Sequence, residues 1–143
     1  MPIYPEVYNA GMSNNNCVFL VDDDPAARNG ISRLLRVAGY DVRSFASSNL
    51  FLDALTSEEC GCLILDSRMP GLSGKELKEE LTARGVHLSI IIVTADDDPE
   101  TRREAEEMKA VGFFRKPVDG TALLDAIDWA IQPRSTDNNA GNT

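Results

Sequence analysis

Residues 62–71 read Cys-Leu-Ile-Leu-Asp-Ser-Arg-Met-Pro-Gly, a short apolar run that ends in the carboxylate of Asp66 and is followed by a chain-breaking Pro-Gly. An apolar run of this length between turn residues is typical of a strand that is buried on both faces, as in a parallel sheet. Asp66 then lies at the carboxyl end of that strand, where open α/β sheets bind their ligands. Aspartate is also common in turns, so this position alone leaves a purely structural role open.

Four other segments are short runs that are either apolar or alternate between apolar and polar residues. These predicted strands cover residues 17–21, 41–45, 89–93 and 112–115. Helix starts lie between them: Asp24-Pro25 joins an N-cap residue to a proline at the first helical position, and Asp98-Pro99 repeats this for a charged helix that we expect to end near residue 110. Five strands that alternate with five helices predict a parallel sheet with helices on both faces and with the first and third strands side by side.

Composition sets limits on the function. The chain has 143 residues, a length that suits one domain, and a formal charge of −9. This acidity argues against direct nucleic-acid binding by the domain and favours cations or basic partner surfaces. No apolar run is long enough to span a bilayer, and no secretory signal pattern opens the chain, so we expect no membrane contact. Cys17 and Cys62 fall in or beside apolar runs and are expected to be buried free thiols, which fits a reducing cytoplasm.

The predicted topology brings polar side chains from four strands to one edge of the sheet. They are Asp22 and Asp23, Asp66, Thr94 and Lys116. Carboxylates gathered at that edge repel one another, by about 4 kcal/mol for two unit charges about 4 Å apart at an effective dielectric near 20. Lys116 supplies one positive charge. Oxygen donors without Cys or His select a hard cation, so the sequence predicts a Mg²⁺ site here.

Such a site can carry out phosphoryl transfer. Asp66 would act as the nucleophile, Lys116 and the metal would neutralise the phosphoryl oxygens, and Thr94 would donate a hydrogen bond to the product. The acyl phosphate adds about one to two negative charges at a defined point. This chemistry indicates a covalent signalling switch rather than a metabolic enzyme.

Four short motifs follow one another along the chain. They are Val-Asp-Asp-Asp-Pro at 21–25, Leu-Asp-Ser-Arg-Met-Pro-Gly at 65–71, Val-Thr-Ala at 93–95 and Phe-Phe-Arg-Lys-Pro at 113–117. On these motifs, residues 17–132 resemble a response-regulator receiver domain of two-component signalling. The resemblance implies a flavodoxin-like (βα)5 doubly wound parallel sheet with strand order 2-1-3-4-5. Residues 1–16 would then be a flexible N-terminal arm, and residues 133–143 a polar tail or linker remnant.

The resemblance also implies a role for each residue of the site. They are the phosphoacceptor Asp66, the Mg²⁺ ligands Asp23, Asp22 (largely through water) and Arg68 (by its backbone carbonyl), the phosphoryl-bridging Lys116, and the switch pair Thr94 and Phe113. One departure is Lys109, which stands where most relatives carry glycine and leaves the shape of that loop open.

Partners follow from the same resemblance. The phosphoryl donor would be a sensor histidine kinase or a phosphotransfer protein, and a second receiver could bind through the fourth helix, fifth strand and fifth helix. A transcriptional output would need a DNA-binding domain that is missing from this chain. Two alternatives stay open: a constitutive protein-interaction module of receiver fold, and a Mg²⁺-dependent phosphohydrolase that uses an aspartyl phosphate.

Overall fold

The computed structural model describes residues 16–56, 61–66 and 71–131. The strands are β1 (Cys17–Val21), β2 (Asp41–Phe45), β3 (Cys62–Asp66), β4 (Ser89–Thr94) and β5 (Gly112–Arg115). The helices are α2 (Pro25–Val37), α3 (Ser48–Ala54), α4 (Gly74–Ala83), α5 (Pro99–Glu107) and α6 (Gly120–Ile131). None of these helices combines the length and the apolar character that crossing a bilayer requires. Of the predicted arm at residues 1–16, residues 1–15 lie outside the described residues, as does the whole of the predicted tail at residues 133–143.

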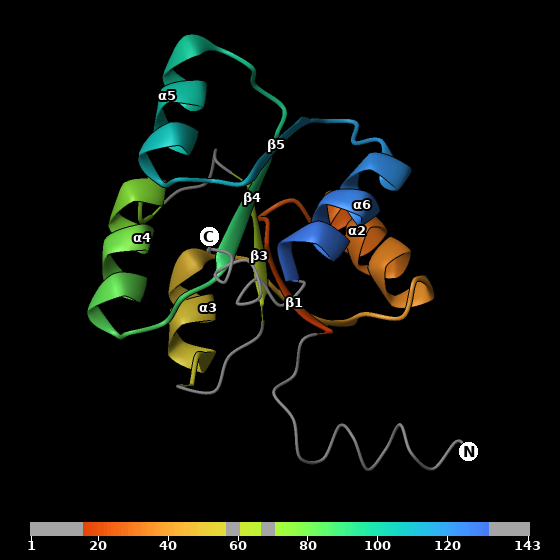
Figure 1. The fold of residues 1–143 in the computed structure, drawn as a ribbon, viewed down its shortest axis with the longest axis horizontal. Coiled ribbons are helices and arrows are strands. Elements are labelled where there is room, and N and C mark those ends of the chain that lie inside the picture. The colour runs from red at the N-terminus through yellow and green to blue at the C-terminus, as the bar shows by residue number, and fades with distance from the viewer. Residues whose placement is uncertain (1–15, 57–60, 67–70, 132–143) are drawn as a thin grey trace, which may run out of the picture.

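All neighbouring strands are parallel, in the order β2-β1-β3-β4-β5. The flavodoxin-like strand order implied by the sequence motifs is therefore confirmed. Helices α2 and α6 cover one face of the sheet, and α3, α4 and α5 cover the other (Figure 1). The strand order reverses at β1, so the carboxyl ends of β1 and β3 lie next to each other. This is the edge at which a doubly wound sheet forms its ligand crevice.

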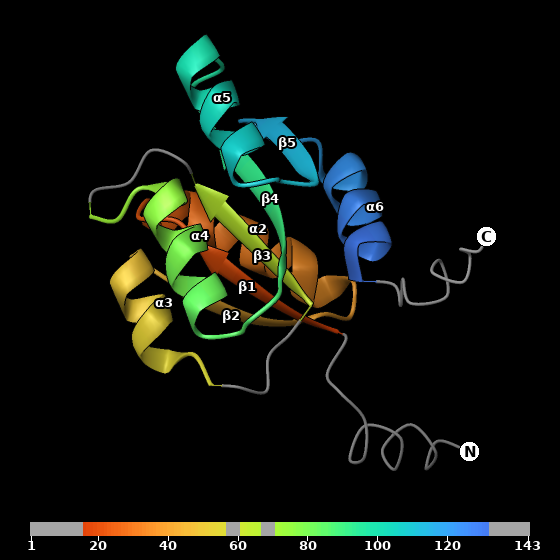
Figure 2. The same cartoon turned by 60° about the vertical axis from the view of Figure 1, so that its left-hand side comes forward.

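The core has two layers because alternate residues of each buried strand point to opposite faces. Phe19, Leu63 and Ile92 pack in the layer beneath α3, α4 and α5. Leu20, Ile64 and Ile91 pack in the layer beneath α2 and α6. The helices that cover these two layers lie on opposite sides of the sheet in Figure 2. A sheet buried on both faces holds its strand ends firmly, so the residues that follow the strands have fixed positions.

Helix caps secure the turns at the functional edge. The carboxylates of Asp24 and Asp98 each accept a hydrogen bond from a backbone N–H in the first turn of their helices, as the sequence predicted. Ser73 and Glu76 form the reciprocal bonds of a capping box at the start of α4. These caps satisfy N–H groups that a helix leaves unpaired at its start.

Helix α5 is shorter than predicted. It ends at Glu107 rather than near residue 110, and Lys109 then adopts the left-handed conformation with a φ of 59°. Few residues other than glycine adopt this conformation readily, which explains why a helical pattern extended past the true end of the helix. The turn at Lys109 leads the chain into β5.

The cysteines only partly follow the prediction. Cys17 and Cys62 are both fully buried, as expected. Cys62 is a free thiol, but Cys17 is disulfide-bonded, so the expectation of a free thiol at that position is wrong. Burial raises the pKa of Cys62 to about 12. The Cys62 side chain is therefore a packed, protonated thiol rather than a reactive thiolate.

A pair of substitutions in α2 tests the two-layer core. Leu35→Ala removes a fully buried side chain from the inner face of α2 and should lower the free energy of unfolding by roughly 2–5 kcal/mol. Val37→Ala, two residues away at a position that is 82% exposed, should change it by less than about 0.5 kcal/mol. Urea unfolding followed by circular dichroism measures both. Equal losses in the two variants would contradict the placement of α2.

Candidate functional site

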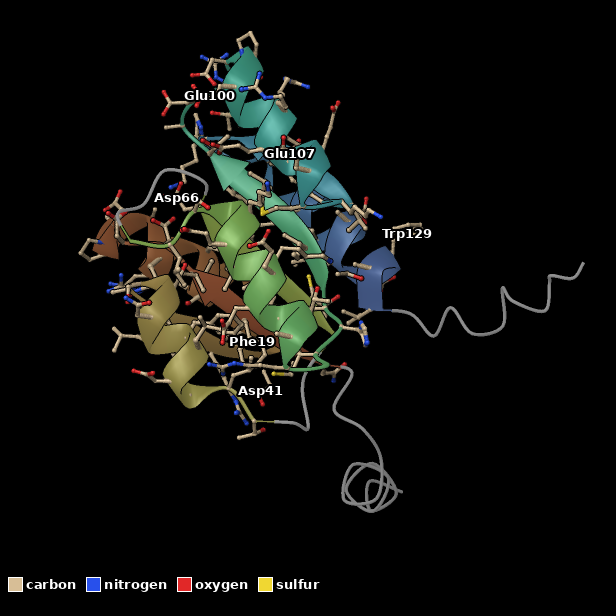
Figure 3. All side chains as sticks on the ribbon, turned by 90° about the vertical axis from the view of Figure 1, so that its left-hand side faces the viewer. Phe19, Asp41, Asp66, Glu100, Glu107 and Trp129 are labelled. Atoms are coloured by element: carbon tan, nitrogen blue, oxygen red, sulfur yellow. The ribbon has the colours of Figure 1, made fainter. Side chains whose placement is uncertain are left out.

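The carboxyl ends of the strands bring five polar side chains to one edge of the sheet. They are Asp22 and Asp23 after β1, Asp66 at the end of β3, Thr94 at the end of β4, and Lys116 after β5. Figure 3 shows Asp66 at the edge opposite Asp41, the first residue of β2. The parallel sheet alone accounts for this gathering, because every strand runs toward the same edge.

Three carboxylates form a compact cluster. One oxygen from each of Asp22, Asp23 and Asp66 lies within 4.8 Å of the other two. Asp22 is 1% exposed and Asp66 is 7% exposed, whereas Asp23 faces solvent. Buried like charges repel one another strongly, so this cluster needs positive charge close by.

Lys116 supplies part of that charge. Its Nζ lies 2.9 Å from Asp22 Oδ2 and 3.4 Å from Asp66 Oδ2, so one ammonium group joins residues from two strands. Partial burial lowers the pKa of Lys116, but the hydrogen bond to Asp22 and the charges of Asp66 and Asp22 outweigh it and raise the pKa above the usual value for lysine. Lys116 is therefore a permanent cation at neutral pH.

The donor set fits a hard divalent cation. Among the described residues, the cluster consists of carboxylate oxygens with no histidine or cysteine in it. Mg²⁺ prefers oxygen ligands and usually keeps several waters, which the exposed side of Asp23 allows. Arg68, whose backbone carbonyl was predicted as a further ligand, lies outside the described residues.

Thr94 and Phe113 share one face of the sheet. Thr94 is wholly buried, and its Oγ accepts a hydrogen bond from the backbone N–H of Asp96 at 3.0 Å. Phe113 pairs in register with Ile92, two residues before Thr94, so the Thr94 and Phe113 side chains point toward the same layer. The half-buried ring of Phe113 packs against the core beneath α5.

Arg102 is a residue that the sequence analysis did not single out. Its guanidinium carbon lies 4.7 Å from the centroid of the Phe113 ring, and its nitrogens bond both carboxylate oxygens of Asp97. The pKa of Asp97 is held below its usual value, first by the hydrogen bond from Arg102. This arginine connects α5, the loop after Thr94 and the ring of Phe113.

The structure thus brings together Asp22, Asp23, Asp66 and Lys116 in direct proximity. Thr94 lies at the end of the adjacent strand, and Phe113 lies further back along β5. The geometry is the one that the sequence predicted, and the functional roles of these residues stay predictions.

Comparison with known proteins identifies the family. The family model for the response regulator receiver domain matches residues 18–128. The chain belongs to the response regulator receiver family. The acidic cluster of Asp22, Asp23 and Asp66 lies within the residues that this family model matches.

Relatives of this receiver include named regulators. It is 40% identical over 110 residues to the transcriptional regulatory protein FixJ of Azorhizobium caulinodans, covering 77% of this chain and 52% of that protein. It is 39% identical over 118 residues to the transcriptional regulatory protein TdiR of Thauera aromatica, covering 82% of this chain and 52% of that protein. The chain spans about half the length of these curated relatives.

Solved structures show the same fold. The response regulator StyR matches with a TM-score of 0.74 and 43% identity, over 87% of this chain and 63% of that one. Full-length FixJ from B. japonicum matches with a TM-score of 0.75 and 35% identity, over 85% of this chain and 61% of that one. Receivers generally serve signalling rather than metabolism, bind Mg²⁺ at their acidic pocket and interact with histidine kinases or phosphotransfer proteins.

Replacement of Lys116 tests the charge balance of the site. Lys116→Met leaves Asp22 and Asp66 facing each other without their cation. It should lower the free energy of unfolding at neutral pH by roughly 2 kcal/mol, between the values for exposed and for fully buried ion pairs.

The sign of the pH dependence follows from the raised pKa of Lys116 in the folded chain. Its contribution is complete below the pKa of an unfolded lysine, about 10.4, and is lost as the pH rises through the folded-state pKa. Chemical denaturation of the wild type and of Lys116→Met should show a difference in unfolding free energy that stays constant from neutral pH to about pH 10 and shrinks above it. A difference that is absent at neutral pH, or that grows in alkali, would contradict this balance.

Proposed function

We propose that this chain is a phosphorylatable signalling switch that accepts a phosphoryl group on Asp66 from a sensor histidine kinase or a phosphotransfer protein. The observation that supports it most is the Lys116 ammonium between Asp22 and Asp66, beside the exposed carboxylate of Asp23. This arrangement combines a nucleophile, fixed positive charge and an open cation-binding side in one place.

In the proposed reaction, a carboxylate oxygen of Asp66 attacks the phosphorus atom of a phosphohistidine. The new O–P bond forms as the P–N bond breaks, and the electron pair of that bond returns to the donor imidazole, which takes up a proton. Lys116 lies within reach of Asp66 Oδ2 and stabilises negative charge on the transferring group.

Asp22, Asp23 and Asp66, with the backbone carbonyl of Arg68, would hold Mg²⁺. The bound ion would supply further positive charge at the phosphoryl oxygens. In the protein itself, Asp66 is almost completely buried, which limits the access of bulk water to the acyl phosphate. The acyl phosphate on Asp66 would therefore persist long enough to act as a signal, rather than being a short-lived intermediate of metabolic turnover.

The conformational relay runs from Thr94 to Phe113. Once Asp66 carries a phosphoryl group, the Thr94 hydroxyl donates a hydrogen bond to it, and the loop held to Thr94 through Asp96 follows. That loop carries Asp97, whose partner Arg102 rests on the Phe113 ring. A shift of the loop thus reaches the ring by direct contacts, as a change of population between two conformers.

The wider context is part of the proposal. The relatives named as transcriptional regulators favour a transcriptional output through a DNA-binding domain outside this chain. In this proposal, residues 133–143 would be the linker and residues 1–16 a flexible arm. A charge of −9 makes direct nucleic-acid contact by this domain unfavourable. A second receiver would bind through α5, β5 and α6. The proposed location of the protein is the cytoplasm.

The decisive experiment is incubation with acetyl phosphate and Mg²⁺, followed by intact-protein mass spectrometry. The wild-type chain should gain one phosphoryl group, and Asp66→Asn should gain none, because the amide is no nucleophile. Asp53→Asn, at an exposed position of α3, is the matched control and should label like the wild type. Labelling of Asp66→Asn would refute the acceptor; no labelling of the wild type would favour a constitutive module, and turnover of added phosphomonoesters a phosphohydrolase.

A second substitution tests the relay. The contacts of Arg102 stabilise the observed positions of Phe113 and of the loop after Thr94. Arg102→Ala should therefore make the proposed shift of this loop and ring easier. The initial rate of labelling by acetyl phosphate should rise about two- to fivefold, the factor that corresponds to a cation–π contact of roughly 0.5–1 kcal/mol. Arg103→Ala removes the same charge from an exposed position of the same helix and should leave the rate near that of the wild type. Equal rates in the two variants would contradict the relay.

A further inference from the structure

The side chain of Arg28 reaches back from α2 to the turn that carries the acidic residues. Its Nη1 donates a hydrogen bond of 2.8 Å to the backbone carbonyl oxygen of Asp22. The backbone N–H of Arg28 also donates to the carbonyl of Asp24 at 2.9 Å. One residue therefore closes this turn through both its main chain and its side chain.

Every polar atom of Asp22 has a partner. Its N–H donates to the carbonyl of Phe45, its Oδ1 accepts from the N–H of Asp24, and its Oδ2 accepts from Lys116. Arg28 provides the partner of the fourth atom, the carbonyl oxygen. Since Asp22 is only 1% exposed, that carbonyl has little access to water, and the guanidinium satisfies it.

The carbonyl of Asp22 belongs to the peptide plane that continues into Asp23. A planar peptide transmits the orientation of one residue to the next, so a fixed carbonyl also fixes the backbone direction of Asp23. Asp23 is exposed and has little packing to hold it. The hydrogen bond from Arg28 therefore restrains the backbone of Asp23, the more exposed of the two aspartates that follow β1.

We infer that Arg28 is a positioning residue for the Mg²⁺ site, which it serves by holding the Asp22–Asp23 peptide rather than by touching the ion. This inference rests on the proposed function of the acidic cluster as a cation site. Arg28 has two opposite effects on the affinity for Mg²⁺. Its hydrogen bond to the Asp22 carbonyl should strengthen binding, and its positive charge should weaken it. A guanidinium near the site repels a divalent cation, so loss of the charge alone would tighten Mg²⁺ binding. Loss of the restraint would weaken it.

Calorimetric titration of the full chain with Mg²⁺ alone separates the two effects. Arg28→Ala should weaken Mg²⁺ binding by about tenfold, the usual cost of removing a group that orients a metal ligand. Arg33→Ala removes the same charge from an exposed position on α2 and should stay within about twofold of the wild type, because an exposed charge is screened. Binding by Arg28→Ala that is tighter than, or equal to, that of Arg33→Ala would overturn the inference.

Unchanged far-ultraviolet circular dichroism establishes that Arg28→Ala is folded. If it is not folded, the uncharged Arg28→Gln gives the same test of sign: weaker binding supports positioning, and tighter or unchanged binding contradicts it.

Labelling by acetyl phosphate at increasing Mg²⁺ distinguishes this inference from the proposed function. For Arg28→Ala, the half-saturating Mg²⁺ concentration should rise by the same factor as the dissociation constant, with a limiting rate within about twofold of the wild type. A lower limiting rate at an unchanged half-saturation would contradict positioning. A wild-type chain that binds Mg²⁺ but takes no label would refute the phosphoacceptor role and leave the role of Arg28 standing.

Discussion

An ammonium group held between two buried carboxylates is the interaction on which the rest of the structure depends. Asp22 and Asp66 lie side by side because β1 and β3 are neighbours, and this proximity would destabilise the fold without a cation. Lys116 reaches them from beyond β5, at 2.9 and 3.4 Å. The sheet order, the two packed faces and the capped helix starts all serve to keep these three charges in place.

The same interaction makes the site responsive. Lys116 balances only part of the negative charge, so the cluster has room for a divalent cation and for a phosphoryl group that redistributes the charge. In the proposed switch, a group that binds there would alter the contacts of Thr94, which ends the neighbouring strand, and of the loop that follows it. The contacts of Arg102 with Asp97 and with the Phe113 ring would carry a displacement of that loop to Phe113. In this proposal, a local change of charge is thereby connected to the exposed surface of α5 and β5.

Much of this could be predicted from the sequence because it depends on local chemistry. Apolar runs predicted the buried strands, and Asp24-Pro25 predicted the start of α2, since capping and a fixed proline φ act within a few residues. The end of α5 was misplaced because Lys109 takes a conformation that its residue type does not favour. The disulfide state of Cys17 depends on a pairing in space, and the apolar run around it carries no trace of that pairing.

The arginine contacts could not be predicted for a similar reason. The bond from Arg28 to Asp22 depends on one side-chain conformation within a turn, and the stacking of Arg102 on Phe113 joins elements that only the folded sheet brings together. A sequence shows many arginines and does not distinguish these two from the others. Both contacts involve a main-chain carbonyl or an aromatic face, neither of which leaves a spacing pattern in the chain.

The most direct test of the central claim is to locate the label itself. After reaction with acetyl phosphate, reduction with borohydride converts an aspartyl phosphate to homoserine, and peptide mass mapping then identifies the position. We predict homoserine at residue 66 alone, formed in the presence of Mg²⁺ and absent when the metal is chelated. Homoserine at Asp22, Asp23 or any other aspartate, or labelling that does not depend on a divalent cation, would contradict the account.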